Sequence, residues 1–479
     1  MSITIVWFRQ DLRLADNPAL SRAAEAGDII PVYVLPPETG RRDGFANGGA
    51  SRWWLHHSLT ALDAALRDKG SRLVVRQGDP IEVLPALVAG TNASGVVWNR
   101  RLEPAGIEVD RELKRRLHEA SVEARSFEGN YLHEPWNVLN KQGEPYKVFT
   151  PYWKALLATG IDLPVCPAPE RLNAVPEAAG GASIDSLGLQ PALDWADAFP
   201  EWWTPGETGA WERFEAFLGE VDQYHATRNR LDLDGTSRLS PHLHFGELSP
   251  RQIVARVRAE HPDALDHKGT EHFLREVGWR EFGANLLHHF PQTETDNLDA
   301  RFDRLAWQND EALIEAWRRG ETGIPVVDAA MRALWTTGWM HNRARMIVAS
   351  FLTKNGLVDW RIGADWFMDT LVDADLPSNT AGWQWVAGTG ADAAPYFRIF
   401  NPVLQGEKFD PEGAFIRRWL PELADLPDKL LNAPWEADPG TLNRAGVRLG
   451  ETYPRPMVDL KASRREALAA FEQIKTYQR

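Results

Sequence analysis

The residues whose side chains could do chemistry are concentrated between positions 338 and 409. This stretch combines guanidinium groups, carboxylates, carboxamides, indoles and a thioether: Arg343, Arg345, Arg398, Asp373, Asp375, Asn342, Asn379, Trp339, Trp360, Trp383, Trp385 and Met346. A packed core alone does not need this mixture, because each buried polar group requires a partner. The mixture instead suits a pocket that holds a large, flat, polar-edged ligand against a second one.

A helix is predicted over residues 341–354, and three of these side chains share one face of it. Asn342, Arg345 and Met346 are spaced i, i+3 and i+4. Arg345 is suited to bidentate pairing with a carboxylate such as Asp373. Because a buried ion pair contributes little net stability, such a pair would serve to hold a polar ligand. The amide of Asn379 could lie close to a cofactor heteroatom and tune its proton and electron affinity.

The sequence GTSRLS at positions 235–240 is a candidate anion site. It offers hydroxyl groups, backbone N–H groups and a guanidinium at the approach to a helix. Turns and helix starts of this kind bind anions, and a diphosphate is the ligand we expect. The alternative is a cluster that caps a helix beginning at Pro250.

A third segment, EHFLREVGWREF at positions 271–282, is predicted to be helical. Its residues Glu276, Trp279 and Arg280 then lie within one turn. Glu276 could accept hydrogen bonds from base edges while Trp279 stacks on a base. The alternative is a surface ion pair beside a core tryptophan.

The first part of the chain alternates strands and helices. We expect strands at 3–7, 29–34, 72–76, 95–98 and 122–127, with helices at 18–25, 50–69, 80–89 and 107–120. This alternation predicts an α/β, Rossmann-like domain with a five-stranded parallel sheet. No GxGxxG follows the first strand, so a dinucleotide fingerprint is not supported.

From residue 209 onward, apolar residues recur at helical spacing, which predicts an all-α domain. We therefore expect an α/β domain over 1–130, an interdomain linker over 131–208 and an all-α domain over 209–479. Pro, Gly and Ala dominate residues 164–181 of the linker.

Composition limits the functional classes. A net charge of −14 argues against unspecific binding of polyanions, so any nucleic-acid site must be a local basic patch. The single cysteine, Cys166, cannot form an intrachain disulfide, which fits a reducing cytosol. The opening MSITIVWF predicts a strand and no signal peptide. No apolar run reaches the roughly 18 residues of a membrane span. We expect a cytoplasmic protein that contacts no membrane.

These segments resemble the photolyase/cryptochrome flavoproteins over nearly the whole chain. The motifs are VWFRQDLRLADNPAL, GTSRLSPHLHFGELS, WREF, GWMHNRARM and the block from GWQW to QGEKFD. The resemblance implies FAD in the helical domain and no metal. It implies that the FAD phosphates are held by Tyr224, Thr236, Ser237, Leu239 and Ser240. It also implies that the isoalloxazine and adenine are surrounded by Trp339, Asn342, Arg345, Asp373, Asp375 and Asn379, with Asn379 at the flavin N5.

Within the family, the chain is most similar to bacterial cyclobutane pyrimidine dimer photolyases, at Glu276, Trp279, Asn342, Met346 and Trp385. A (6-4) photolyase would have a histidine pair at positions 341–342 and another histidine at 346. The resemblance implies a carbon–carbon lyase that repairs dimers in DNA by electron transfer from photoexcited reduced FAD. The alternatives are a cryptochrome-type blue-light receptor with a signalling output and a flavoprotein that only binds nucleic acid.

The resemblance also assigns roles around the lesion. The dimer must be flipped out of the helix, as in other base-flipping enzymes, among which photolyases are already counted. Glu276 would hydrogen-bond the dimer, Asn342 and Met346 would form the floor, and Trp279 and Trp385 would form the walls. Flanking phosphates would contact Arg228, Arg343 and Arg398. A tryptophan relay to the flavin would consist of Trp383, Trp360 and Trp307.

The N-terminal domain is expected to hold an antenna chromophore. Glu38 and the pair Trp53–Trp54 suggest a groove for methenyltetrahydrofolate, while the loop ASRWWLHHSL also resembles that of 8-hydroxydeazaflavin binders. The expected partner is DNA that contains pyrimidine dimers. We expect a monomer with no obligatory protein partner.

Overall fold

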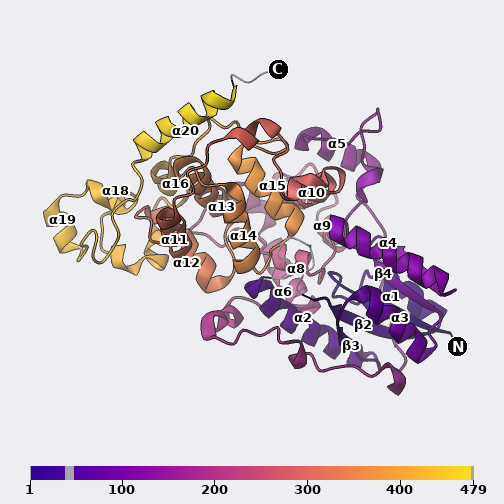
Figure 1. Ribbon diagram of the computed structural model, residues 1–479. Coiled ribbons are helices and arrows are strands. Elements are labelled where there is room, and N and C mark those ends of the chain that lie inside the picture. Colours follow the sequence, from indigo (N-terminus) through magenta and orange to yellow (C-terminus); the bar gives the residue numbers. More distant parts are fainter. Residues whose placement is uncertain (1, 38–47, 476–479) are drawn as a thin grey trace. The chain divides into compact units, whose positions relative to one another are not determined.

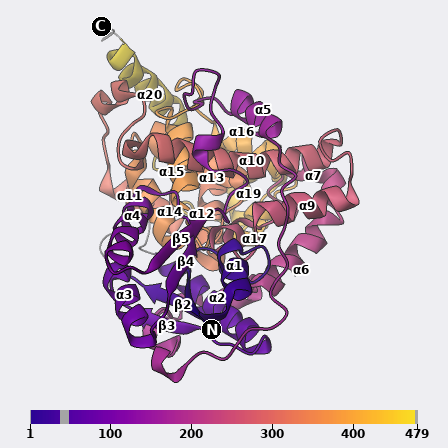
Figure 2. The ribbon, with the colours of Figure 1, turned by 90° about the vertical axis from the view of Figure 1, so that its right-hand side faces the viewer.

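The computed structural model describes residues 2–37 and 48–475 (Figure 1). Its sheet contains β1 (Ile3–Phe8), β2 (Asp28–Leu35), β3 (Val74–Gln77), β4 (Gly95–Asn99) and β5 (Glu123–Phe127). The strands are parallel and lie in the order β3-β2-β1-β4-β5, with β1 at the centre (Figure 2). The predicted five-stranded parallel sheet is confirmed.

Four helices flank the strands: α1 (Pro18–Ala26), α2 (Gly49–Asp68), α3 (Pro80–Thr91) and α4 (Pro104–Glu119). Side chains of β1 alternate between the two faces, and both faces are buried, as a parallel sheet requires. Ile5 and Trp7 pack in one cluster with Leu87 of α3 and Leu113 of α4. Helix α4 begins three residues before the predicted start, because Pro104 occupies its first turn, where the missing N–H costs nothing.

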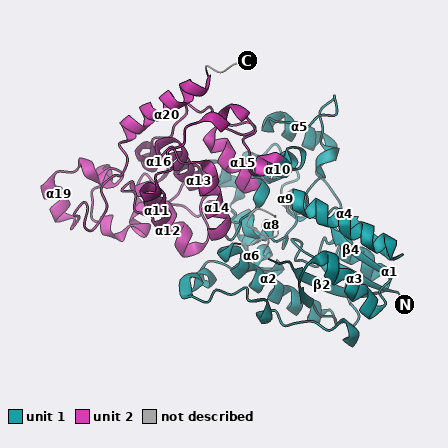
Figure 3. Cartoon of the chain, viewed as in Figure 1, with its two compact units in different colours: residues 1–225, 237–291, 372–377 teal, residues 226–236, 292–371, 378–479 magenta. Residues whose placement is uncertain are grey.

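The chain forms two compact units (Figure 3). Unit 1 contains residues 1–225, 237–291 and 372–377, and unit 2 contains residues 226–236, 292–371 and 378–479. This division follows backbone contacts, and the boundaries predicted for the three domains stay a prediction. After the sheet, the chain forms α5 (Phe149–Thr159), α6 (Glu207–Leu218), η6 (Val221–Gln223), α7 (Tyr224–Thr227), α8 (Ser240–His244), α9 (Pro250–Glu260) and α10 (Lys268–His289).

Helix α5 lies inside the segment predicted to be a linker. It packs on α10 through the buried residues Phe149, Tyr152 and Trp153. Pro151 lies in its first turn, where proline is tolerated, but in the sequence it looks like a helix breaker.

The later part of the chain is helical, as predicted. It forms α11 (Glu311–Arg319), α12 (Pro325–Thr337), α13 (Asn342–Ser350), α14 (Trp360–Thr370), α15 (Leu376–Ala387), α16 (Pro402–Phe409), α17 (Ala414–Trp419), α18 (Asp428–Leu431), α19 (Pro439–Arg444) and α20 (Leu460–Lys475). The helix predicted over 341–354 exists, but its last turn is a π-helix, η9 (Phe351–Asn355).

Within the described ranges, no helix combines the length and the apolar character that crossing a membrane would need.

Candidate functional site

Helix α13 carries three of the predicted site residues on one face. His341 caps the helix, since its Nδ1 accepts a hydrogen bond from the Arg343 N–H at 3.0 Å. Asn342 is exposed, while Arg345 and Met346 are partly buried. The Arg345 Nε donates to the Met340 carbonyl at 2.7 Å, which fixes the stem of the guanidinium against the preceding turn. The predicted pairing of Arg345 with Asp373 stays a prediction.

Asn379 of α15 is held in one orientation. Its Nδ2 donates to the carbonyl of Ala364 in α14 at 3.1 Å. Because the amide nitrogen is used in this way, the amide oxygen is turned to the other side and can accept a hydrogen bond. This arrangement suits an acceptor for a ligand N–H.

The carboxylates of Asp373 and Asp375 lie in a buried turn of unit 1, with exposed fractions of 5% and 9%. The Asp375 N–H donates to the Asp373 carbonyl at 2.7 Å, and His244 Nδ1 lies 3.7 Å from the Asp375 carboxylate. A buried carboxylate needs charged or hydrogen-bonding partners. His244 was not singled out from the sequence, although it lies within the motif SPHLHFG.

The candidate anion segment leads into α8 and not into the helix at Pro250. Arg238 has a left-handed backbone with φ of 50°, the Leu239 N–H donates to Ser237 Oγ at 3.4 Å, and the Ser237 carbonyl accepts from Arg213 Nε at 3.1 Å. Helix α9 has its own capping box, made by Ser249 and Gln252. The alternative interpretation, a cap for the helix at Pro250, is therefore wrong.

Tyr224 of α7 is buried among aromatic rings. Its ring makes edge contacts with Phe217 at 5.5 Å and with Phe273 at 5.9 Å. These contacts fix the position of the residue at the start of the segment that leads to the candidate anion site.

Helix α10 carries Glu276, Trp279 and Arg280, as predicted. The Trp279 ring stacks on Phe149 at 3.9 Å with an interplanar angle of 9°, so one face of the indole is already covered. Arg280 is turned inward, since it donates to the Asn130 carbonyl at 2.8 Å and lies 4.4 Å over the Tyr131 ring. Glu276 is partly buried.

The three predicted relay tryptophans differ in burial. Trp383 and Trp360 are 2% and 1% exposed, while Trp307 is partly exposed. The Trp383 ring contacts Phe367 at 5.1 Å and Trp317 at 6.2 Å. Trp317 was not singled out, because the amphipathic pattern of α11 makes it look like an ordinary core residue.

Gly363 of α14 leaves room for the Trp383 indole. A Cβ atom at position 363 would lie 2.0 Å from Trp383 Cη2, which no side chain could tolerate. The Trp360 indole is fixed separately, since its Nε1 donates to Asn297 Oδ1 at 2.9 Å. Both indoles are therefore held in defined positions within unit 2.

The three predicted phosphate-binding arginines belong to unit 2. Arg343 donates to Asn229 Oδ1 at 2.7 Å and lies 4.5 Å over the Phe409 ring. Burial lowers the pKa of Arg343, and the nearby charge of Arg228 lowers it further. Arg398 is exposed and Trp385 is partly buried.

Trp53 and Trp54, which were expected to line the antenna groove, are both buried. The Trp54 indole is 0% exposed and donates to Glu247 Oε1 at 3.0 Å, and its neighbour Trp53 is 4% exposed. Both are core side chains because Trp203, Phe199 and Phe245 pack around them. The burial of both indoles gives the predicted groove no support, and the antenna assignment stays a prediction; Glu38 lies outside the described residues.

Comparison with known proteins identifies the family. Residues 4–171 match the family model described as DNA photolyase, and residues 273–473 match the FAD binding domain of DNA photolyase. The chain is 48% identical to a deoxyribodipyrimidine photo-lyase of Agrobacterium fabrum, over 98% of both chains. The chain belongs to the DNA photolyase family.

Two further relatives show the range of this photolyase family. A solved bacterial class III photolyase from Agrobacterium tumefaciens has 46% identity and a TM-score of 0.95, and the match covers 99% of this chain and 98% of that one. Cryptochrome-2 of Arabidopsis thaliana is 38% identical over 96% of this chain and 77% of its own length. The expectations of a photolyase-type lyase, of an FAD-binding domain and of a role in DNA repair are confirmed.

Proposed function

We propose that the protein repairs cyclobutane pyrimidine dimers in DNA by light-driven electron transfer. Reduced FAD, when bound, supplies light absorption and the electron. The observation that carries the proposal is the set of residues suited to a dimer: Glu276 and Trp279 on one helix, and Asn342 with Met346 on one face of another. Position 346 holds a thioether and position 342 an amide, so neither offers the imidazole acid that (6-4) chemistry needs.

The side chains assigned to FAD have the chemistry that this cofactor would need. Hydroxyl and backbone N–H groups at Thr236, Ser237, Leu239 and Ser240, with Tyr224, would hold the diphosphate. The flavin ring and adenine would contact Trp339, Asn342, Arg345, Asp373, Asp375 and Asn379. The fixed amide of Asn379 supports this assignment, because its oxygen can accept a hydrogen bond from the flavin N5 position. The burial of both carboxylates supports it as well, since buried charges serve polar ligands.

The dimer itself would be recognised by four kinds of contact. Glu276 would accept hydrogen bonds from the pyrimidine edges. Trp279, through the face that Phe149 does not cover, would pack on the lesion together with Trp385. Asn342 and Met346 would lie beneath it. A dimer stacks and pairs poorly, so the free-energy cost of flipping it out of the duplex is low.

Arg228, Arg343 and Arg398 would hold the phosphates that flank the lesion. The charges of Arg228 and Arg343 interact unfavourably in the protein alone. A phosphate placed between two such guanidinium groups would relieve this repulsion, which makes the pair a better anion site than either arginine alone.

Trp383, Trp360 and Trp307 would pass electrons to an oxidised flavin. The proposal is supported by their graded burial, from two core indoles to one that is partly exposed. For the antenna, methenyltetrahydrofolate remains our proposal and 8-hydroxydeazaflavin the alternative.

Two measurements test the proposed cofactor and substrate. Flavin released by denaturation should run as FAD on chromatography, and release of FMN or of no flavin would contradict the phosphate assignment. Duplexes that carry a cyclobutane dimer, a (6-4) photoproduct or no lesion should then be compared in binding. We expect the dimer duplex to bind tightest. Equal binding of all three would favour the cryptochrome-type receptor, the second candidate, which the Arabidopsis relative supports.

A further inference from the structure

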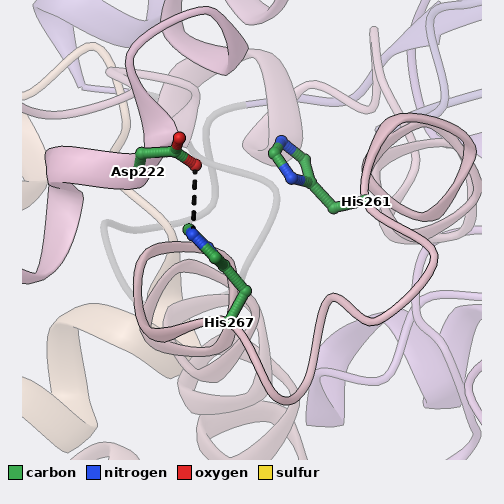
Figure 4. A group of neighbouring side chains, drawn as sticks. All are labelled: Asp222, His261 and His267. Carbon is green, nitrogen blue, oxygen red and sulfur yellow. Dashed lines mark ion pairs between the residues drawn. The ribbon is translucent and has the colours of Figure 1, made fainter.

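Three metal-ligating side chains converge outside the residues assigned to FAD and DNA. Asp222, His261 and His267 place one carboxylate oxygen and two imidazole nitrogens within 4.8 Å of one another. They come from η6, from the residue after α9 and from the residue before α10. Figure 4 shows the three side chains pointing toward one another.

The distances suit a metal better than a hydrogen bond. Asp222 Oδ1 lies 3.4 Å from His267 Nε2, which is longer than an ordinary N–H···O contact. Tetrahedral zinc, with bonds of about 2.0–2.2 Å, separates neighbouring ligand atoms by roughly 3.3–3.6 Å. The imidazole rings of His261 and His267 lie nearly parallel, with an interplanar angle of 24° and a distance of 5.5 Å between the ring centroids. The other two edges both involve His261, whose ring nitrogen lies within 4.8 Å of each partner atom. A movement of the His261 ring by up to roughly 1.5 Å would bring both edges to the tetrahedral spacing.

The backbone that carries these ligands is already packed in place. Thr270 is fully buried, and its Oγ1 lies 2.5 Å from the Ala264 carbonyl oxygen and 3.1 Å from that of His267. Its single O–H can donate to either carbonyl, which ties down the α9–α10 loop. Gly269 touches η6, since a Cβ there would lie 2.1 Å from the Val221 carbonyl. Little chain ordering is therefore needed when an ion binds.

We propose that Asp222, His261 and His267 bind one divalent transition-metal ion, with zinc as the best chemical match. Imidazole nitrogens select zinc and its neighbours in the first transition series, whereas magnesium and calcium prefer oxygen ligands. Three protein ligands leave a fourth position for water. Side-chain exposures of 60% for Asp222 and 43% for His267 give the ion access from solvent.

The ion would stabilise the chain next to Tyr224, which is assigned to FAD. It would link η6 to the loop between α9 and α10, and Tyr224 follows Asp222 by two residues. The expectation of no metal followed from the family resemblance alone. Asp222, His261 and His267 lie on separate segments, and their spacing matches no metal-ligand motif. The proposal does not depend on the proposed repair activity.

The test uses the full-length flavoprotein, freed of metal with a chelator. Zinc is titrated in competition with a chromophoric chelator, and cobalt(II) is titrated separately to report coordination by its visible absorption. We expect one equivalent to bind and cobalt(II) to give the intense bands of four-coordinate geometry. His261→Ala and His267→Ala should each weaken binding at least about 100-fold, since loss of even an outer partner costs up to that much.

Matched variants keep the result interpretable. His272→Ala removes a histidine in the second turn of α10, whose side chain is 42% exposed and whose Nδ1 lies 2.8 Å from the Lys268 carbonyl. This variant should bind zinc like the parent. Asp222→Asn, at an exposed position, should weaken binding without a folding defect, and FAD content checks the fold of every variant. Absence of stoichiometric zinc binding in the parent, or an equal loss in His272→Ala, would overturn the proposal.

Discussion

Glu276 is the residue that would distinguish a dimer from the protein's other ligands. It lies on α10, partly buried, three residues before Trp279, whose ring is fixed by Phe149. Glu276→Ala should weaken dimer binding by roughly 1.5–3 kcal/mol, the value of a hydrogen bond to a charged group. FAD content should not change, because the carboxylate is assigned to the lesion.

Binding of a dimer duplex by the parent and the variant measures this effect. Glu271→Ala removes a carboxylate of the same helix that pairs with Arg275, so it serves as a control and should bind like the parent. If Glu276→Ala also binds and repairs like the parent, Glu276 is a surface residue without a role in recognition.

Trp383 can be tested for redox function separately from packing. Phe is smaller than Trp, so Trp383→Phe fits beside Gly363 and keeps an aromatic ring against Phe367. It should block photoreduction of oxidised FAD, since Phe is not oxidised at an accessible potential. Repair by chemically reduced protein should persist.

Flavin absorbance under illumination measures photoreduction of oxidised FAD. Dimer repair by the chemically reduced protein is measured separately. Trp335→Phe, at an indole that is 51% exposed, is the control and should photoreduce like the parent. A prereduced Trp383→Phe protein that cannot repair would show that the residue shapes the fold or the lesion site.

At this scale, helical spacing was enough to place Asn342, Arg345 and Met346 on one face, because local periodicity determines which residues share a helix face. Helical spacing could not predict that His244 lies close to Asp375, or that Trp317 contacts Trp383. These contacts join residues far apart in the sequence, and their distance is set by packing.

The π-helical turn η9 contains a buried lysine. Lys354 in this turn is 1% exposed, its Nζ donates to the Arg398 carbonyl at 3.2 Å, and it lies 5.3 Å from the Tyr396 ring. Burial, reinforced by the charge of Arg398, lowers the pKa of Lys354 to about 7. The charged form is thus disfavoured in the folded state.

This pKa predicts how stability depends on pH. Between about pH 7 and the ordinary lysine pKa of 10.5, the unfolded chain holds a proton on Lys354 that the folded chain lacks. The free energy of unfolding should therefore gain up to about 1.4 kcal/mol per pH unit from this group as pH rises through that range. The destabilisation is greatest below about pH 7.

Lys354→Met gives an unbranched side chain that is one atom shorter and carries no charge. It should stabilise the protein most at neutral pH, and its advantage should shrink toward pH 10. Thermal unfolding of parent and variant across this range checks the prediction, and Lys461→Met, at an exposed position on α20, is the control. A difference between Lys354→Met and parent that does not vary with pH would mean that the amine is solvated.

The elements were predictable where strong local signals mark them. The strands of the sheet are apolar runs between turn residues, and the helices after residue 209 show clear periodicity. Helix α5 was not predicted, because Pro151 in its first turn is usually taken as a sign that a helix ends. The π-helical turn was not predicted, because nothing in the sequence around Lys354 distinguishes the i→i+5 hydrogen bonds of a π-helix from the i→i+4 hydrogen bonds of an α-helix.

For the whole molecule, the net charge of −14 constrains how DNA is bound. Each phosphate contact releases counterions, with a log–log slope of about −0.9 per contact. Arg228, Arg343 and Arg398 therefore predict a salt slope near −2 to −3 for a dimer duplex. The acidic remainder should suppress binding to undamaged DNA.

Salt titrations of both duplexes test this prediction. Arg343→Ala should flatten the slope by roughly one unit and weaken both duplexes similarly, since phosphate contacts carry little sequence information. Arg301→Ala, at an exposed arginine that pairs with Asp299, is the control. Affinity that does not depend on salt would contradict the assignment of the three arginines.

The central claim is light-driven repair of cyclobutane dimers, and one illumination experiment tests it most directly. The chemically reduced protein is mixed with an oligonucleotide that contains a single dimer and illuminated with blue or near-ultraviolet light. We expect pyrimidine absorbance to recover in the light. We expect no recovery in the dark, and none with flavin-free protein. Dimers that stay intact under light, in a sample whose FAD is present and reduced, would contradict the account.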